Sequence, residues 1–221
     1  MKVGKEVGIR IPPNHSWLEY KLNQQELDYV WRCIDNKKKD FKYQLAGNID
    51  ASVSLKDRSE WFFRETIRPL IVEYEQTFGS LGNDTPINQK FEYHMPSWWV
   101  NYQKQNEFNP IHHHGGVYSF VIWMKIPTSH FQQNKKAIAL KSNSPSISSF
   151  NFIYSDILGR TRTYPYDLSP KDDGKMVLFS SKLHHLVYPF YDCDETRVSV
   201  SGNIQFNTSR VMMSNVLNNQ P

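Results

Sequence analysis

The chain has 221 residues, enough for one domain with a substantial core, and its 14% of aromatic residues argues against disorder. The formal net charge of +4 is too small to indicate a nucleic-acid-binding protein by itself. No apolar run approaches the ~20 residues of a membrane-spanning helix, and residues 1–13 lack the apolar segment of a signal peptide. The two cysteines, Cys33 and Cys193, have no metal or redox spacing, so we expect reduced thiols in a soluble, cytoplasmic protein.

Residues 1–85 predict a short strand, within the first sixteen residues, and then two helices. The first helix is expected to begin at Asn23, because Asn23 and the glutamate three residues later have the spacing of a capping box. The second helix is expected to run over about 57–78. Pro69 lacks a backbone N–H, so it should kink or interrupt that helix.

After about residue 86 the pattern changes to short β-branched and aromatic runs that are separated by turns. The runs are FEYHM, WWVNYQ, VYSFVIWMKI, AIALKS, SSFNFIYS, KMVLFSS, LVYPF and RVSVSGNIQFN. Many short strands at close spacing are typical of an all-β sandwich or barrel. There is no internal repeat and no linker-like segment, so we predict a single domain. Its N-terminal helices should pack on a β core at 86–210, and a tail should follow at 211–221.

Three consecutive histidines stand shortly before the run VYSFVIWMKI. Side chains alternate between the two faces of a strand, so His112 and His114 would share one face and His113 would point away. Asn109-Pro110 favours extended backbone just before them, and Gly115-Gly116 allows the chain to turn close to a ligand. Two imidazoles on one face can bind one metal ion. The alternative is a polar loop with three exposed histidines.

Two later segments complete a possible site. His184 and His185 are neighbours, so only one of them should face a metal; either one alone would be interpreted as an ordinary surface histidine. In the strand predicted at 197–207, Arg197 and Ser199 share a face with further polar residues. A guanidinium group and a hydroxyl two residues apart can bind a carboxylate together. The alternative is an ordinary strand whose polar face lies in water.

The order H-x-H, then a histidine about 70 residues further on, then R-x-S resembles the Fe(II)/2-oxoglutarate-dependent oxygenase superfamily. More narrowly, it is similar to a 2OG-Fe(II) oxygenase family of bacteria and of phages, including cyanophages. The resemblance covers roughly residues 95–207, in the motifs WWVNYQKQNEFNPIHHHGGVYSFVIWMKIP, LFSSKLHHLVYP and RVSVSGNI. In that family the distal histidine begins the motif H-x-V-x-P, which selects His185, followed by Val187 and Pro189, over His184.

The resemblance implies a mainly β fold, the double-stranded β-helix or cupin-like jelly roll, with a metal at its open mouth. The residues that it implies as ligands of Fe(II), and thus as catalytic residues, are His112, His114 and His185. Those that it implies as contacts of the cosubstrate 2-oxoglutarate are Arg197, Ser199 and Asn101.

The implied activity is that of a dioxygenase, an oxidoreductase that uses O2. It would hydroxylate a substrate while 2-oxoglutarate is decarboxylated to succinate. The sequence does not indicate which small molecule or protein is the substrate. It also does not indicate nucleic acid as a partner. A homodimer through the N-terminal helices is possible. A phage member of the family would act in the host cytoplasm.

One position departs from the pattern of the superfamily. His114 stands where an aspartate or glutamate usually completes the two-histidine, one-carboxylate triad. A carboxylate from elsewhere, such as Glu107 or Asp156, could complete the ligand set instead. Three histidines also suit a zinc hydrolytic site or a cupin-like metalloenzyme that does not use 2-oxoglutarate. A third alternative is a jelly-roll binding module without enzymatic activity.

The aromatic residues near these motifs allow two interpretations, a substrate pocket or packing inside the barrel, and we favour packing for most of them. These residues are Trp98, Trp99, Tyr102, Tyr118 and Trp123.

Overall fold

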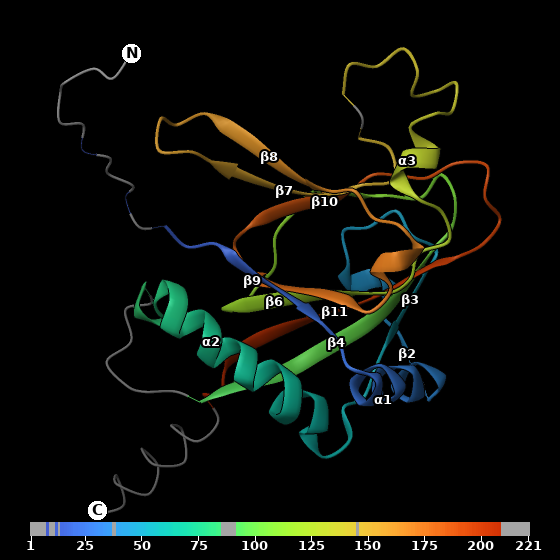
Figure 1. Cartoon of the computed structure of the whole chain (residues 1–221). Helices are drawn as coiled ribbons and strands as arrows, with labels where there is room; N and C mark the ends of the chain where they lie inside the picture. Colours follow the sequence, from blue (N-terminus) through green and yellow to red (C-terminus); the bar gives the residue numbers. More distant parts are fainter. Residues whose placement is uncertain are drawn as a thin grey trace, which may run out of the picture.

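The protein consists of two facing β-sheets, with two main helices packed against the outer side of the larger sheet (Figure 1). The structure is a computed structural model, and it describes residues 8, 12, 14–36, 39–84, 92–144 and 146–208. The predicted tail at 211–221 and most of the strand predicted in the first sixteen residues lie outside the described residues.

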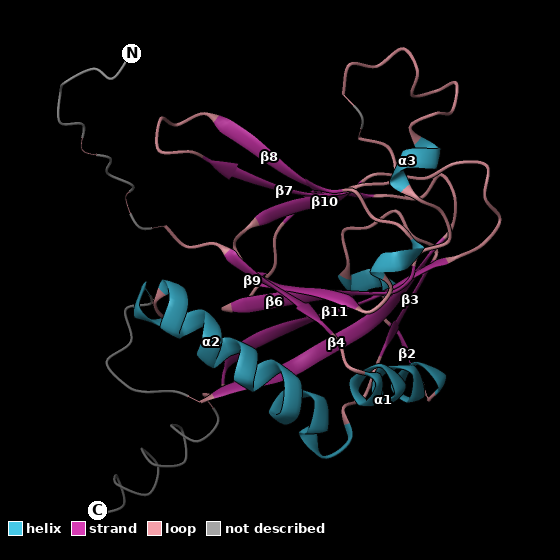
Figure 2. Cartoon of the chain, in the orientation of Figure 1, coloured by secondary structure: helices cyan, strands magenta, loops and turns pink. Residues whose placement is uncertain are grey.

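Within the described residues, seven antiparallel strands form the larger sheet and four form the smaller one. In spatial order the larger sheet contains β1 (Trp17–Lys21), β9 (Lys175–Ser180), β6 (Tyr118–Lys125), β11 (Arg197–Phe206), β4 (Tyr93–Gln103), β3 (Ala51–Ser54) and β2 (Lys39–Asp40). The smaller sheet contains β5 (Asn109–His112), β10 (His184–Val187), β7 (Phe150–Ser155) and β8 (Thr161–Tyr166). Figure 2 shows the two layers of strands. This jelly roll confirms the predicted fold class.

Each central strand divides its side chains between two buried regions, because successive residues face opposite sides of a sheet. On β11, Val200 packs in the cluster between the larger sheet and the helices, while Arg197 and Ser199 line the space between the two sheets. Trp98 of β4 also faces the helices, and its ring stacks on Phe62 with centroids 5.4 Å apart. The helices therefore cover the outer face of the sheet and leave the inner face for the site.

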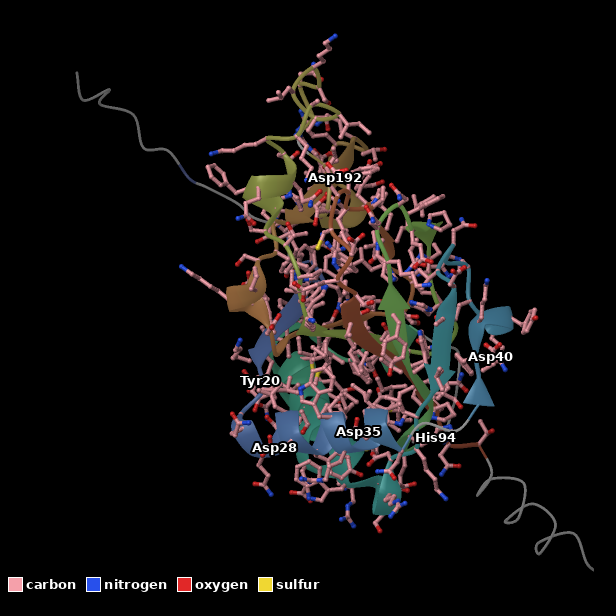
Figure 3. The ribbon with its side chains drawn as sticks, turned by 90° about the vertical axis from the view of Figure 1, so that its right-hand side faces the viewer. Tyr20, Asp28, Asp35, Asp40, His94 and Asp192 are labelled. Carbon is pink, nitrogen blue, oxygen red and sulfur yellow. The ribbon has the colours of Figure 1, made fainter. Side chains whose placement is uncertain are left out.

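The first helix, α1 (Gln24–Asp35), begins as the sequence predicts. The side-chain oxygen of Asn23 accepts the Glu26 backbone N–H at 3.0 Å, and the Glu26 carboxylate accepts the Asn23 N–H at 2.8 Å. This reciprocal pair satisfies two of the N–H groups that a helix start leaves without partners. The exposed residues of α1 include Asp28 and Asp35, both labelled in Figure 3.

The second predicted helix is interrupted just before Pro69, as expected. A π-helical turn at Phe63–Ile67 precedes α2 (Arg68–Phe78), whose first N–H donates five residues back, to the carbonyl of Phe63. A proline cannot donate to the carbonyl four residues before it, and a wider turn accommodates its ring. The helix ends at Gly79, which has a φ of +88°.

The prediction of a strand at 137–142 is wrong, because these residues form turns after the short helix α3 (His130–Gln133). Ile138 and Leu140 alternate as they would in a strand, but they are 60% and 69% exposed. Neither described sheet includes a strand from this segment. Alternation is therefore a poor guide where no neighbouring strand can pair with the backbone N–H and C=O groups.

The structure also contains strands that were not predicted from the sequence, among them β2, β3 and β8. β3 and the short β2 come from the part of the chain that was expected to supply mainly helices, and both join the larger sheet. β8 has polar residues and a proline, and five of its six residues are exposed. It forms an edge of the smaller sheet, where proline is tolerated and no apolar alternation is needed.

The remaining helical elements are short 3-10 turns at η1 (Lys42–Gln44), η2 (Arg58–Glu60), η4 (Leu81–Asp84) and η5 (Pro170–Asp172). Both cysteines are free thiols, as predicted. None of the described helices combines the length and the apolar character that crossing a membrane requires.

Candidate active site

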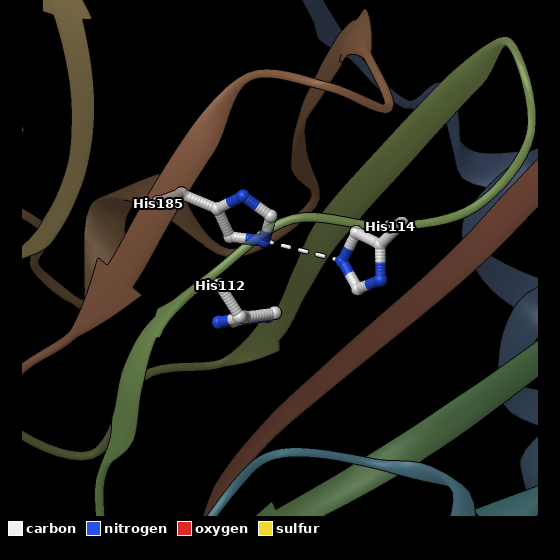
Figure 4. A group of neighbouring side chains, drawn as sticks. All are labelled: His112, His114 and His185. Carbon is white, nitrogen blue, oxygen red and sulfur yellow. Dashed lines mark hydrogen bonds between the residues drawn. The ribbon is translucent and has the colours of Figure 1, made fainter.

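Three histidines converge between the two sheets. β5 and β10 are neighbours, and their pairing places His112 opposite His185, with ring centroids 4.2 Å apart. His114 follows β5, and its Nε2 lies 3.2 Å from Nε2 of His185 (Figure 4). One ring nitrogen from each of the three lies within 4.8 Å of the others. This separation suits three ligands of one metal ion.

The neighbouring histidines face away, as strand alternation predicts. His113 and His184 are exposed, and their rings contact each other with centroids 5.1 Å apart. Of the two histidines on β10, His185 is the buried one, at 4% exposure. Parity along the strands thus brings together the three histidines named from the sequence and separates them from the other two.

Backbone carbonyls orient two of the three rings. Nδ1 of His112 lies 2.7 Å from the carbonyl oxygen of Pro110, and Nδ1 of His185 lies 3.0 Å from that of Leu183. A neutral imidazole that donates its Nδ1–H to a carbonyl presents the lone pair of Nε2 to the other side. Such hydrogen bonds fix the tautomer and the angle of a metal-binding histidine.

Burial keeps the three rings neutral. It lowers the pKa of His112, and it lowers the pKa of His114 to about 4, with a smaller contribution from the adjacent histidines. The pKa of His185, which is the most buried, lies well below its ordinary value for the same reason. Neutral imidazoles are the form that binds metal ions, so these three rings could bind one near pH 7.

Arg197 forms the other end of the site. Its side chain is buried at 3% exposure, with Nη1 3.3 Å from Oε1 of Gln103 and Nη2 3.1 Å from the carbonyl oxygen of Ser148. Nη2 also donates to the Ser148 hydroxyl, and the guanidinium lies over the Phe190 ring at 4.9 Å. Its Nε is buried and has no partner.

The environment of Arg197 suits an anionic ligand. Burial lowers the pKa of its guanidinium to about 10, so the group is still charged at pH 7. Among the described residues, no carboxylate forms an ion pair with it. A buried charge without a counterion is costly, and a carboxylate that bound here would remove that cost.

A single cavity of about 180 Å³ joins the two ends. The sequence-predicted residues that line it are His112, His114, His185, Arg197, Ser199 and Asn101. Ser199 and Asn101 are partners across β11 and β4. The Ser52 hydroxyl of β3 donates to the side-chain oxygen of Asn101 at 2.7 Å, so the amide of Asn101 is held from the far side.

The carboxylates considered as alternative metal ligands are engaged elsewhere. The Glu107 carboxylate accepts the backbone N–H groups of Asp50 at 3.0 Å and Lys104 at 2.8 Å. Asp156 bonds Arg160 and other groups of its own turn at 2.9–3.1 Å. In the described part of the chain, the three histidines alone form a group that could hold a metal.

The aromatic residues divide between packing and pocket. Tyr102, Tyr118 and Trp98 pack in the cluster beneath the helices, as favoured from the sequence. Trp99 and Trp123 line the cavity, and Trp123 also packs in the second core cluster, against Phe150 and Tyr166. Strand parity would have separated Trp98 from Trp99, because adjacent residues of β4 face opposite sides.

Sequence reasoning missed three residues that hold the site together. Gln103 lies two residues after Asn101 on the same face of β4, and that spacing could have identified it. Ser52 lies on a strand that was not predicted. Ser148 lies in a loop with a φ of +66°, and no pattern in the sequence indicates that it meets Arg197.

Comparison with known proteins links this cavity to one enzyme family. Residues 97–203, from β4 to β11, match the family model described as "Putative 2OG-Fe(II) oxygenase". This segment contains every residue that was proposed from the sequence for the metal and the cosubstrate. A search of curated proteins finds no match.

Solved structures resemble the fold at low sequence identity. A prolyl-4-hydroxylase of Pseudomonas putida is 13% identical with a TM-score of 0.50, over 87% of this chain and 94% of that one. A 2OG-Fe(II) oxygenase family member of Burkholderia pseudomallei is 10% identical with a TM-score of 0.51, over 86% and 84%. A prolyl hydroxylase of Trichoplax adhaerens, solved with a hypoxia-inducible-factor peptide, is 10% identical with a TM-score of 0.51, over 89% and 85%.

Proposed function

We propose that this chain, which belongs to the 2-oxoglutarate- and Fe(II)-dependent oxygenases, uses the cavity between its two sheets to hydroxylate a substrate. The observation that carries the proposal is the placement of two unlike groups in one cavity. Three neutral histidines lie at one end, and the buried, unpaired cation of Arg197 lies at the other. A ligand that chelates a metal and also has a distant carboxylate would satisfy both.

His112, His114 and His185 would hold the iron. Their donor set fits, because three neutral imidazole nitrogens are within reach of one ion and imidazole suits iron. Iron held there would activate O2 for the oxidation of a C–H bond while 2-oxoglutarate is decarboxylated to succinate. The carbonyl hydrogen bonds of His112 and His185 would keep their lone pairs directed at the ion.

Arg197 would bind the far carboxylate of 2-oxoglutarate, and its buried Nε is an N–H donor that is free for this purpose. Guanidinium–carboxylate pairs are strong because two charge-assisted hydrogen bonds can form together. Ser199 would add a hydroxyl from the same face of β11, and Asn101 would donate from β4. Gln103 and Ser148 hold the guanidinium in place while it does so.

The neutral ring of His114 changes the charge of the site. With a carboxylate in its place, the protein ligands would carry one negative charge; with three imidazoles they carry none. Fe(II) and the doubly charged 2-oxoglutarate then cancel each other, and Arg197 leaves a net positive charge. We therefore expect tighter binding of the dianionic cosubstrate than in a site with two histidines and a carboxylate.

The substrate is proposed only at the level of its chemistry, as a C–H bond in a small molecule or a protein side chain. Two of the solved structures are prolyl hydroxylases, but at 10–13% identity their likeness supports the fold and not their substrates. We also propose a cytoplasmic location, which the two free thiols support.

The test begins with anaerobic protein, Fe(II) and 2-oxoglutarate. We expect a visible metal-to-ligand charge-transfer band, and succinate should form when O2 is admitted. His185→Ala should abolish both, and His184→Ala is the matched control because its ring faces away from the cavity. Absence of both the band and succinate in the unmodified protein would rule the proposal out.

A second candidate function follows from His114 itself. Three histidines without a carboxylate also describe a metalloenzyme that does not use 2-oxoglutarate. That enzyme would bind metal in the same experiment but show no charge-transfer band. Its metal content and activity would then not respond to 2-oxoglutarate or to Arg197→Ala.

A further inference from the structure

The cavity that joins the histidines to Arg197 contains no acidic side chain among its described lining residues. Its cations are Arg197 at the inner end and Lys42 near the opening, where the Lys42 side chain is 44% exposed. The other polar residues near the opening include Gln44 and Asn109, which are neutral amides, and the exposed His113. A charged substrate group that entered here would meet positive charge from two sides and no negative side chain among the described lining residues.

Lys42 lies on a segment that is fixed at several points. The Lys42 N–H donates to the Asp40 carboxylate at 2.9 Å; Asp40 ends β2 and is labelled in Figure 3. The ring of Phe41 stacks on Trp99 at 5.3 Å, and Trp99 in turn lies 5.9 Å from the His114 ring. These contacts hold the backbone of Lys42 in a defined position. The rings of Phe41 and Trp99 connect its segment to His114 of the proposed metal site.

The same segment contacts β5 closely. Backbone hydrogen bonds join Asn48 and Phe108 at 2.9 and 3.4 Å. A side-chain carbon on Gly47 would lie 1.8 Å from the side-chain oxygen of Asn109, so that position has no room for one. Asn109 and Lys42 are thereby held on the same rim of the opening.

The charge of Lys42 is only partly balanced within the protein. Asp50 lies 4.0 Å from the Lys42 ammonium and 3.7 Å from that of Lys104, so one exposed carboxylate serves two cations. Exposed pairs at such distances contribute little. Lys104 does not line the cavity, whereas Lys42 does.

We propose that the substrate of this site is an anion, with a carboxylate or phosphate group that binds Lys42 while the carbon to be oxidised lies near the three histidines. The inference rests on the proposed function. Fe(II), 2-oxoglutarate and Arg197 together leave one positive charge inside, and Lys42 adds a second at the rim. Substrates with an ammonium group near the reactive carbon are disfavoured by the same charges.

The test compares ligands of similar size and different charge. Anaerobic protein with Fe(II) and saturating 2-oxoglutarate is titrated with butyrate, butyramide, butylamine and propyl phosphate, and the shift of the charge-transfer band reports binding. We expect the two anions to bind roughly two- to fivefold more tightly than the amide, as one partly exposed ion pair would provide, and the amine to bind most weakly. The stronger of the two anions identifies the group as carboxylate or phosphate.

Variants of the two lysines separate a specific contact from general charge. Lys42→Ala should remove the preference for anions and Lys42→Arg should keep it. Lys104→Ala, which loses the same net charge beside the same Asp50, should leave it unchanged. Equal binding of amide and anions, or a preference that survives Lys42→Ala, overturns the inference. If the charge-transfer band itself fails to form, the proposed function fails first, so the two failures are distinguishable.

Discussion

The two ends of the cavity are built by different means. At the histidine end, each oriented ring is held by the carbonyl two residues earlier in its own segment, Pro110 for His112 and Leu183 for His185. At the arginine end, Arg197 is held by Gln103 and Ser148, which are 94 and 49 residues away in the sequence. One end depends on local backbone geometry and the other on the packing of the whole barrel.

This difference has a consequence for how the two ends respond to change. The histidine end can keep its geometry as long as β5 and β10 remain paired. The arginine end needs β4, β11 and the loop before β7 to be in place together. Substitutions at one end therefore test whether binding of the metal and binding of 2-oxoglutarate can be changed separately.

The largest expected effect comes from Arg197→Met, which removes the only cation at the inner end of the described cavity. Affinity for 2-oxoglutarate should fall by about 100-fold or more, because truncating one member of a buried charged pair costs about 3–5 kcal/mol. Metal affinity should be unchanged. Calorimetry with 2-oxoglutarate and metal analysis measure the two quantities, and Arg160→Met, at an exposed arginine, is the control. A parallel loss of metal would mean that the two ends are coupled.

Acidification should affect the histidine end alone. Buried imidazoles in the metal-free protein have a lowered pKa, about 4 for His114, whereas the unfolded chain has the ordinary pKa of 6.5. Below pH 6.5 the unfolded state binds more protons, so stability should fall as the pH drops from 6.5 towards 4. The slope is at most about 1.4 kcal/mol per pH unit for each histidine.

Denaturant unfolding of the metal-free protein at pH 7 and pH 5 measures that slope. His114→Gln should reduce it by roughly one histidine's share. Arg197, with a pKa of about 10, does not titrate in this range, so Arg197→Met should leave the slope unchanged. If His114→Gln had the same slope as the unmodified protein, the pH dependence could not be attributed to the buried ring of His114.

His114→Asp exchanges the neutral ligand for the carboxylate that is usual in the superfamily. We expect metal binding to persist, because an aspartate oxygen is also a good ligand for iron. Affinity for 2-oxoglutarate should fall by roughly tenfold, since the added negative charge repels the dianion. The charge-transfer titration measures it, and His184→Asp, whose side chain is exposed and does not line the cavity, controls for a change of surface charge. Tighter binding of 2-oxoglutarate in His114→Asp would refute the charge argument.

The smallest effect is expected for Gln103→Ala. The Gln103 side chain donates to the Glu107 carbonyl and accepts from Arg197, so it positions the guanidinium without being required to touch the ligand. The KM for 2-oxoglutarate should rise by about fivefold while kcat stays nearly constant, in line with about 1 kcal/mol for one hydrogen bond that acts on the ligand only through Arg197. Gln105→Ala, at a half-buried glutamine that bonds Asp194 and does not line the cavity, is the control and should leave both constants unchanged.

Local patterns predicted the parts of this molecule whose cause is local. Alternation separated His112 and His114 from His113, and the capping box located the start of α1. The same alternation failed at 137–142, because a strand also needs a partner that the local pattern does not specify.

The arginine end of the cavity shows most clearly which contacts cannot be predicted from the sequence. The face of β11 that carries Arg197 and Ser199 was predicted, since it follows from alternation. The contacts to Gln103 and Ser148 were not, because they depend on which segments meet when the barrel closes. The choice of His185 over His184 as the histidine that faces the site came from the resemblance to a family. His185 is the buried one of the two, which agrees with that choice.

The edges of the larger sheet have a consequence for how the chain folds. β1 pairs with β9, so Trp17 lies opposite Phe179 across more than 150 intervening residues. Such a pairing cannot form until most of the chain has left the ribosome, and contacts of high sequence separation slow the search for the native state. The helices α1 and α2 can form early because their hydrogen bonds are local, but the sheet that they cover must wait. We therefore expect slow folding, on the scale of milliseconds to seconds, with the docking of β1 among its last steps.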